Sequence, residues 1–112
     1  MNNEIKFTPI FLKETAEFLR YLSTDVRQKI LKNIEKAQII NDVKLFKKLK
    51  GNIWELRTSY QGMEYRLLAF WDKRDSKKTL VVATHGFTKK TNKVPEKEIE
   101  KAERIRNQYF ED

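Results

Sequence analysis

Residues 53–71, IWELRTSYQGMEYRLLAFW, decide the fold of this 112-residue chain. Before Gln61-Gly62, Trp54, Leu56, Thr58 and Tyr60 fall on one face and the residues between them on the other, and this period of two is typical of β-strands. Gln61-Gly62 itself predicts a tight turn. We therefore expect a strand that begins at Ile53 and a return strand that ends at Trp71, paired as an antiparallel hairpin.

The position of the turn fixes which residues of the two strands face each other. If the turn is centred as proposed, Arg57 lies directly opposite Arg66, and like charges in such a pair are destabilising. One interpretation is that an anion binds between the two arginines. The other is that Glu55 and Glu64, on the same side of the hairpin, neutralise them in ordinary surface ion pairs. The pattern alone leaves both interpretations open.

Helical periodicity precedes the hairpin. Thr8-Pro9 predicts an N-cap and a first helical residue, and apolar residues at three-to-four spacing continue to Leu22. Ser23 or Thr24 is expected to cap a second helix, whose apolar stripe ends at Ile40. We expect these two helices to form an antiparallel hairpin.

The remaining segments complete a single domain over residues 1–112. Val43–Gly51 is a lysine-dense stretch and is expected to be a connector, whereas Thr79–Phe87 is rich in β-branched residues and predicts a third strand. Pro95, followed by alternating glutamates, predicts the start of a last helix. The whole pattern predicts an α+β fold with an N-terminal helical hairpin, a twisted antiparallel sheet of three to four strands and a C-terminal helix.

Composition excludes several classes of protein. The chain has no cysteine and one histidine, so neither a disulfide framework nor a thiolate zinc site is available, and we expect no metal and no cofactor. Its longest apolar run, Leu67–Trp71, is far too short to cross a bilayer. The N-terminus does not resemble a secretion signal. We expect a cytoplasmic protein that does not bind membranes.

Basic residues are concentrated in the middle of the chain. Residues 44–93 carry thirteen of the 24 Lys and Arg but four of the 16 Asp and Glu, although the net charge of the whole chain is +8. Such a block favours binding of a polyanion. The alternative is a solvated lysine-rich face, which is common and weakly specific.

The run His85-Gly86-Phe87-Thr88-Lys89-Lys90-Thr91 adds a histidine and two adjacent lysines at the end of the third strand. Lys89 and Lys90 are suited to holding phosphate. His85 is either an acid or base or a hydrogen-bonded structural residue, and the pattern does not decide whether it shares a face with the arginines. Two tryptophans and a tyrosine could stack on bases, but their alternation favours the core. Together with the basic block, these residues indicate an RNA site.

Several motifs together resemble the HigB-type toxins, the phage-derived branch of the RelE/ParE superfamily. They are Phe46-Lys47-Lys48-Leu49, Trp54-Glu55-Leu56-Arg57, Tyr65-Arg66-Leu67-Leu68-Ala69-Phe70, the run from His85 to Thr91, and Pro95 before an acidic helix. The resemblance covers nearly the whole chain. It implies a compact RelE-like α+β fold and an endoribonuclease that cleaves mRNA on translating ribosomes. It also implies a partner, a helix-turn-helix antitoxin from an adjacent gene that holds the toxin inactive.

On this basis we carry Arg57, Arg66 and Lys89 over as catalytic positions, with His85 or a lysine among other cations as the general base. The C-terminal tyrosine that some RelE relatives use has no clear counterpart, since Tyr109 falls inside the last helix. The expected reaction is a metal-independent attack of the ribose 2′-hydroxyl on phosphorus, leaving a 2′,3′-cyclic phosphate or 3′-phosphate. Flanking RNA or the ribosome would be bound by Lys47, Lys48, Lys50, Lys90 and Lys93.

Two other classes of function stay open. ParE-like toxins bind DNA gyrase and lack nuclease activity, and a non-catalytic RNA-binding regulator would show the same basic block. The free toxin is expected to be a monomer that forms a hetero-oligomer with its antitoxin.

Overall fold

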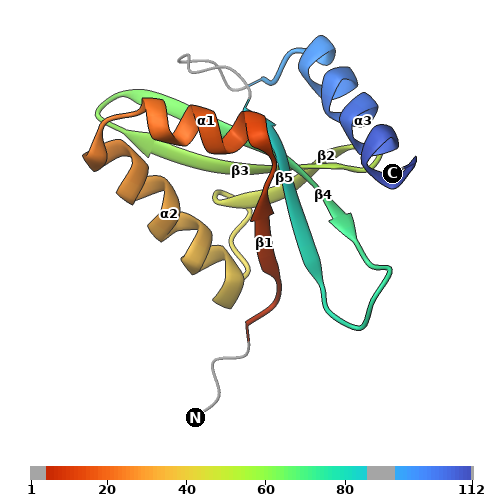
Figure 1. The fold of residues 1–112 in the computed structure, drawn as a ribbon. Helices are drawn as coiled ribbons and strands as arrows, with labels where there is room; N and C mark the ends of the chain where they lie inside the picture. The colour runs from red at the N-terminus through yellow and green to blue at the C-terminus, as the bar shows by residue number, and fades with distance from the viewer. Residues whose placement is uncertain (1–4, 86–92, 112) are drawn as a thin grey trace.

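The computed structural model describes residues 5–85 and 93–111. Five strands form one sheet in the order β1-β5-β4-β3-β2, in which β1 is parallel to β5 and the other neighbours are antiparallel. Three helices cover the sheet, which confirms the expected α+β class (Figure 1). In chain order the elements are β1 (Thr8–Phe11), α1 (Lys13–Tyr21), α2 (Thr24–Ile39), β2 (Phe46–Lys50), β3 (Ile53–Tyr60), β4 (Met63–Asp72), β5 (Thr79–His85) and α3 (Glu96–Glu111).

Helices on both faces of the sheet explain the uninterrupted apolar run in β4. Leu67 and Ala69 belong to the core beneath α1 and α2, which also holds Leu19 of α1 and Ile34 of α2. The residues between and after them, Leu68 and Phe70, belong to the second core with Ile99 and Ala102 of α3. Because consecutive side chains of a strand leave opposite faces, a strand that is covered on both sides must be apolar at every position.

The hairpin has the predicted register. Arg57 pairs with Arg66, and the turn residues Gln61 and Gly62 have φ angles of 50° and 80°. Positive φ at both central residues is the geometry of a two-residue turn that matches the right-handed twist of its strands. Gly62 is well suited to such an angle because it has no Cβ.

The first expected helix starts four residues too early, and an additional strand takes its place. Thr8 and Pro9 do not cap a helix; they begin β1, which lies at the edge of the sheet and pairs with β5 through Thr8–Thr79 to Phe11–Val82. An edge strand tolerates a proline, since its missing N–H need not reach a neighbour. The helix begins only at Lys13, after the parallel strand has placed it over β5.

The lysine-dense stretch is not a simple connector. It contains β2, the other edge strand, which pairs with β3 and has an irregularity between Lys48 and Lys50. Lysines on an exposed edge discourage pairing with other chains. The sheet therefore has five strands rather than three to four, and β1 makes it mixed rather than wholly antiparallel.

The helical predictions after residue 22 are confirmed. Ser23 caps α2, where its hydroxyl accepts a hydrogen bond from the backbone N–H of Val26 at 3.4 Å. Helices α1 and α2 are joined by two residues, and α1 packs on β5 whereas α2 packs on β3 (Figure 1). On the opposite side, α3 places Ile105 and Tyr109 against the second core, as its spacing predicts.

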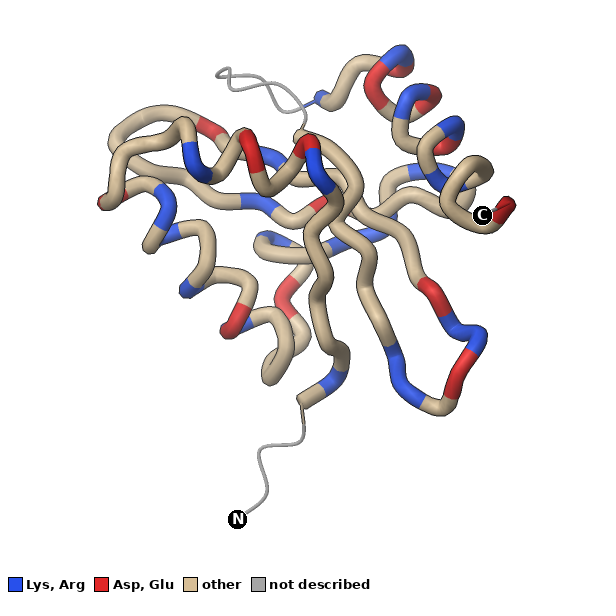
Figure 2. Tube along the Cα trace, viewed as in Figure 1, with Lys and Arg blue, Asp and Glu red and all other residues tan. Residues whose placement is uncertain are grey.

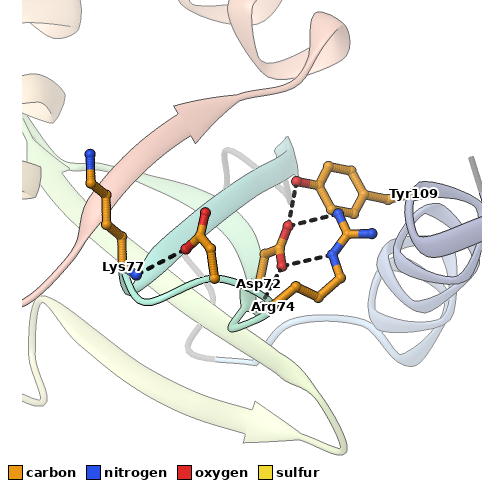
Figure 3. Close-up of polar contacts among 5 residues, drawn as sticks. Asp72, Arg74, Lys77 and Tyr109 are labelled. Carbon is orange, nitrogen blue, oxygen red and sulfur yellow. Dashed lines mark hydrogen bonds and ion pairs between the residues drawn. The ribbon is translucent and has the colours of Figure 1, made fainter.

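A polar network fastens α3 to the end of β4 (Figure 3). The hydroxyl of Tyr109 donates to Oδ2 of Asp72 at 2.8 Å. The guanidinium of Arg74 binds the same carboxylate through two N–H donors, each at 3.0 Å. These hydrogen bonds hold the pKa of the Asp72 carboxyl far below its usual value, and Arg74 makes the largest contribution.

Candidate functional site

The two opposed arginines lie on the sheet face that α3 covers farther along. Each is paired with a carboxylate on the neighbouring strand: Nε of Arg57 lies 3.4 Å from Oε1 of Glu64, and Nε of Arg66 lies 3.5 Å from Oε2 of Glu55. Charges of opposite sign therefore alternate diagonally across β3 and β4. The neutralisation by Glu55 and Glu64, one of the two interpretations drawn from the sequence, is present in the structure.

The two ion pairs differ in burial. The side chains of Arg66 and Glu55 are 1% and 2% exposed, whereas those of Arg57 and Glu64 are 24% and 21% exposed. Burial raises the pKa of Glu55, although the charges of Arg66, Arg57 and Lys47 oppose this rise. The pair of Arg66 and Glu55 is thus not an ordinary surface ion pair.

Arg57 is the arginine that an anion from solvent can reach. Its Nε faces Glu64, and its side chain is partly exposed, whereas that of Arg66 is buried. The planar guanidinium fork of an arginine matches the geometry of a phosphate. Arg66, directly opposite, adds positive charge from the interior of the sheet.

His85, the last residue of β5, lies on the other face. It is aligned with Leu67, which packs in the core beneath α1 and α2. Its ring stacks on Phe18 of α1, with ring centroids 4.1 Å apart and planes 3° from parallel. The side chain of His85 therefore does not join those of Arg57 and Arg66.

Glu14 of α1 organises the residues around His85. Its Oε2 lies 3.7 Å from Nδ1 of His85, accepts a hydrogen bond from Nζ of Lys101 at 3.0 Å and contacts the hydroxyl of Thr84. Burial raises the pKa of Glu14, but the hydrogen bonds from Thr84 and Lys101 outweigh it, and the pKa is lowered. The carboxylate is thus held ionised beside the imidazole.

Sequence reasoning missed this cluster, because Glu14 and Thr84 are separated by 70 positions. One signal was available. Glu14 and Phe18 are four residues apart, a spacing that places both on one face of a helix. Nothing in the sequence indicated which strand that face would meet.

The predicted RNA-binding lysines are spread over several surfaces. In β2, Lys47 is opposite Glu55 and Lys48 is opposite Trp54, whereas Lys50 forms an ion pair with Glu96 of α3. Lys93 is exposed shortly before α3. The predicted positions Lys89 and Lys90 lie outside the described residues. Figure 2 shows Lys and Arg on every helix as well as on the sheet.

The family model described as Phage derived protein Gp49-like (DUF891) matches residues 17–107. The chain belongs to this family. Gp49-like proteins are the HigB-like toxin branch of the RelE/ParE superfamily, which confirms the resemblance found in the motifs. No curated protein and no solved structure matches the chain.

Within residues 5–85 and 93–111 of this Gp49-like chain, no helix is long and apolar enough to cross a membrane. The same residues contain no group of three or more His, Cys, Asp or Glu side chains that could hold a metal ion.

Proposed function

We propose that the protein, as one domain over residues 1–112, is the toxin of a type II toxin–antitoxin system. In this proposal it is an endoribonuclease that cleaves mRNA on translating ribosomes. Membership of the HigB-like family supports this class of activity. The observation that carries the proposal is the partly exposed side chain of Arg57, which lies directly opposite a second, buried arginine.

The proposed reaction uses the positive charge of Arg57 and Arg66. The 2′-oxygen of a ribose attacks the adjacent phosphorus while the bond from phosphorus to the 5′-oxygen breaks, which gives a 2′,3′-cyclic phosphate and a 5′-hydroxyl. Negative charge grows on the nonbridging oxygens, and Arg57 binds them while the buried charge of Arg66 stabilises the same transition state. Lys89 is proposed to protonate or stabilise the leaving 5′-oxygen.

The 2′-hydroxyl proton has two candidate acceptors, His85 and a lysine. Nδ1 of His85 faces Glu14, which leaves Nε2 for a substrate. Because the side chain of His85 leaves the sheet on the face opposite to Arg57, the geometry does not favour His85 as the base for a phosphate bound at Arg57. In a His85→Gln variant, a loss of about 10²-fold or more in cleavage rate assigns the base to His85, since general-base catalysis has this size. A smaller loss assigns it to the lysine.

Substitution of Arg57 tests the proposed activity. Arg57→Ala should lower the rate of mRNA cleavage by roughly 10³-fold or more, by analogy with arginines that stabilise phosphoryl-transfer transition states. Arg57→Lys should recover part of the rate, because an ammonium cannot make the bidentate contact of a guanidinium. Arg104→Ala, on the exposed side of α3, is the matched control and should cut normally. Cleavage by Arg57→Ala at the wild-type rate would refute the role of Arg57.

Expression in cells distinguishes this activity from gyrase binding and from RNA binding without catalysis. The proposed nuclease should cause loss of mRNA and halted translation. Filamentation with a DNA damage response would instead indicate a gyrase-binding toxin. A regulator that binds RNA without catalysis should leave mRNA intact in both cells and cleavage assays.

The proposed chemistry needs no metal, because the arginines supply the positive charge that stabilises the phosphate in the transition state. Cleavage should therefore proceed in excess EDTA as it does without it, provided that ribosomes, where they are needed, are kept intact with magnesium. End-group analysis should find cyclic phosphate or 3′-phosphate. Products with a 3′-hydroxyl would contradict the attack by the 2′-oxygen.

A further inference from the structure

A groove of about 460 Å³ lies at the far end of the sheet from His85, where β3 begins and β4 ends. Its aromatic lining consists of Trp54, Trp71 and Phe110. Four cations complete the groove: Lys48, Lys73, Arg74 and Arg106. No Asp or Glu side chain is among the described residues that line it.

Most of the positive charge in this groove is not neutralised. Arg74 is bound to Asp72 and stacks on Phe110, with its guanidinium carbon 4.8 Å from the ring centroid. Lys48, Lys73 and Arg106 form no ion pair with any residue in 5–85 or 93–111. They differ in this from Arg57 and Arg66, whose charges are each balanced by a glutamate.

The two tryptophans separate this groove from a second one of about 440 Å³. Trp54, Trp71 and Lys48 line both, and the charged residues that the second groove adds are Lys6, Lys47, Lys78 and Asp42. Both tryptophans are partly exposed, and they meet edge to face with ring centroids 5.9 Å apart. Both tryptophans therefore lie beside cations in each of the two grooves.

We propose that Trp54 and Trp71 form a second binding site for single-stranded RNA, in which a base stacks on a tryptophan. Lys48, Lys73 and Arg106 bind the adjacent phosphates. Partly exposed aromatic rings beside unpaired cations are the combination that binds single strands without strict sequence preference. This inference rests on the proposed function, because the RNA is the mRNA segment that flanks the cleaved bond.

The site is separate from the arginine pair. Along β4, Trp71 is five residues from Arg66, which corresponds to roughly 17 Å of strand. The side chain of Trp71 contacts the core beneath α1 and α2, whereas Arg66 faces Glu55 on the other side of the sheet. RNA bound at both places passes over the edge formed by β2, where Lys47 and Lys48 lie on opposite faces.

Tryptophan fluorescence tests the proposal directly, because the chain has two tryptophans and both line the groove. Short oligouridylate should quench the emission of an Arg57→Ala protein, which binds RNA at this groove without cutting it. Trp71→Leu should weaken binding on the order of tenfold, the size of one base–aromatic stack. Lys73→Ala and Arg106→Ala should each reduce the slope of log affinity against log salt by about 0.7, one phosphate contact apiece. Lys29→Ala, exposed on α2, should leave the slope unchanged.

Several results would overturn the proposal. One is unchanged emission at low salt; another is an affinity that neither Trp71→Leu nor Arg106→Ala lowers. Quenching by an acidic peptide of matched charge but not by oligouridylate would assign the groove to a protein segment instead. Thermal melts of each variant separate lost binding from lost folding. If wild-type protein failed to cut RNA but oligouridylate still quenched, the proposed function would fail while the RNA site stood.

Discussion

Arg57 and Arg66 face each other across β3 and β4, yet their surroundings give them different energetic roles. Solvent reaches the pair of Arg57 and Glu64, so screening keeps its contribution to stability small. The pair of Arg66 and Glu55 is almost fully buried, so loss of either charge leaves the other buried without its partner. Arg57 thus belongs to an exposed site, whereas Arg66 on the neighbouring strand belongs to the interior.

Alanine substitutions of Arg66 and Arg57 should differ in their effect on the free energy of unfolding. Arg66→Ala should lower the free energy of unfolding by about 3–5 kcal/mol, because it leaves the Glu55 carboxylate buried without its partner. Arg57→Ala should change it by less than about 1 kcal/mol. Denaturant unfolding measures both. The double variant Arg66→Met with Glu55→Leu should recover most of the loss, and equal effects of the two alanine substitutions would show that burial does not distinguish the arginines.

At the scale of elements, α3 is held to the sheet by apolar packing and by one polar network. Ile99 and Ala102 bury the first half of the helix, and Tyr109 packs on Phe70 with ring centroids 5.3 Å apart. The hydrogen bond from Tyr109 to Asp72 then links the end of the helix to the end of β4. Because Asp72 also fixes Arg74, this carboxylate sets one wall of the groove beside Trp71.

The stability that Asp72 contributes should depend on pH. The folded-state pKa of Asp72 is depressed, so its stabilisation is present above its unfolded value, about 3.8, and is lost as the pH falls through the folded value. Asp72→Asn should therefore be less stable than wild type at neutral pH, and the difference should shrink below about pH 4. Thermal melts across this range measure it. Asp75→Asn, in the loop after β4, is the control, because the Asp75 carboxylate accepts a hydrogen bond from the backbone N–H of Lys77; a difference for Asp72→Asn that grows at acid pH would contradict the assignment.

At the scale of the whole molecule, charge is the dominant property. The chain carries a net charge of +8, and the basic block includes Lys47 beside the arginine pair as well as Lys48, Lys73 and Arg74 of the groove at Trp71. A field of this sign steers polyanions toward the protein and makes binding depend on salt. The same positive charge favours binding of an inhibitor that covers these surfaces with acidic side chains.

The partnership prediction follows from this charge and from the toxin family. A small helix-turn-helix protein from the adjacent gene should co-purify with the chain, and the complex should bind DNA but not cleave RNA. Light scattering should find a monomer for the free toxin and a hetero-oligomer for the complex. An unrelated neighbouring gene, together with no partner recovered from native lysate, would count against the proposal.

Residues close in sequence determined what could be predicted of the fold. The turn at Gln61 and Gly62 sets the register of the hairpin, and hence the opposition of Arg57 and Arg66. The cap at Ser23 and the apolar face of α3 likewise follow from contacts within a few residues. Local geometry governs all three, so a periodic pattern is enough to place them.

Tertiary structure alone decided the edges of the sheet and the surroundings of the site. β1 and β2 are strands only because β5 and β3 supply their hydrogen-bonding partners, and neither short segment carries a strong pattern of its own. A one-residue shift in pairing between Leu68 and Ala69 helps to set the register of β5 and so the face of His85. The burial of Arg66 with Glu55 depends on how the layers close over the sheet. Such contacts join distant parts of the chain, and no local spacing encodes them.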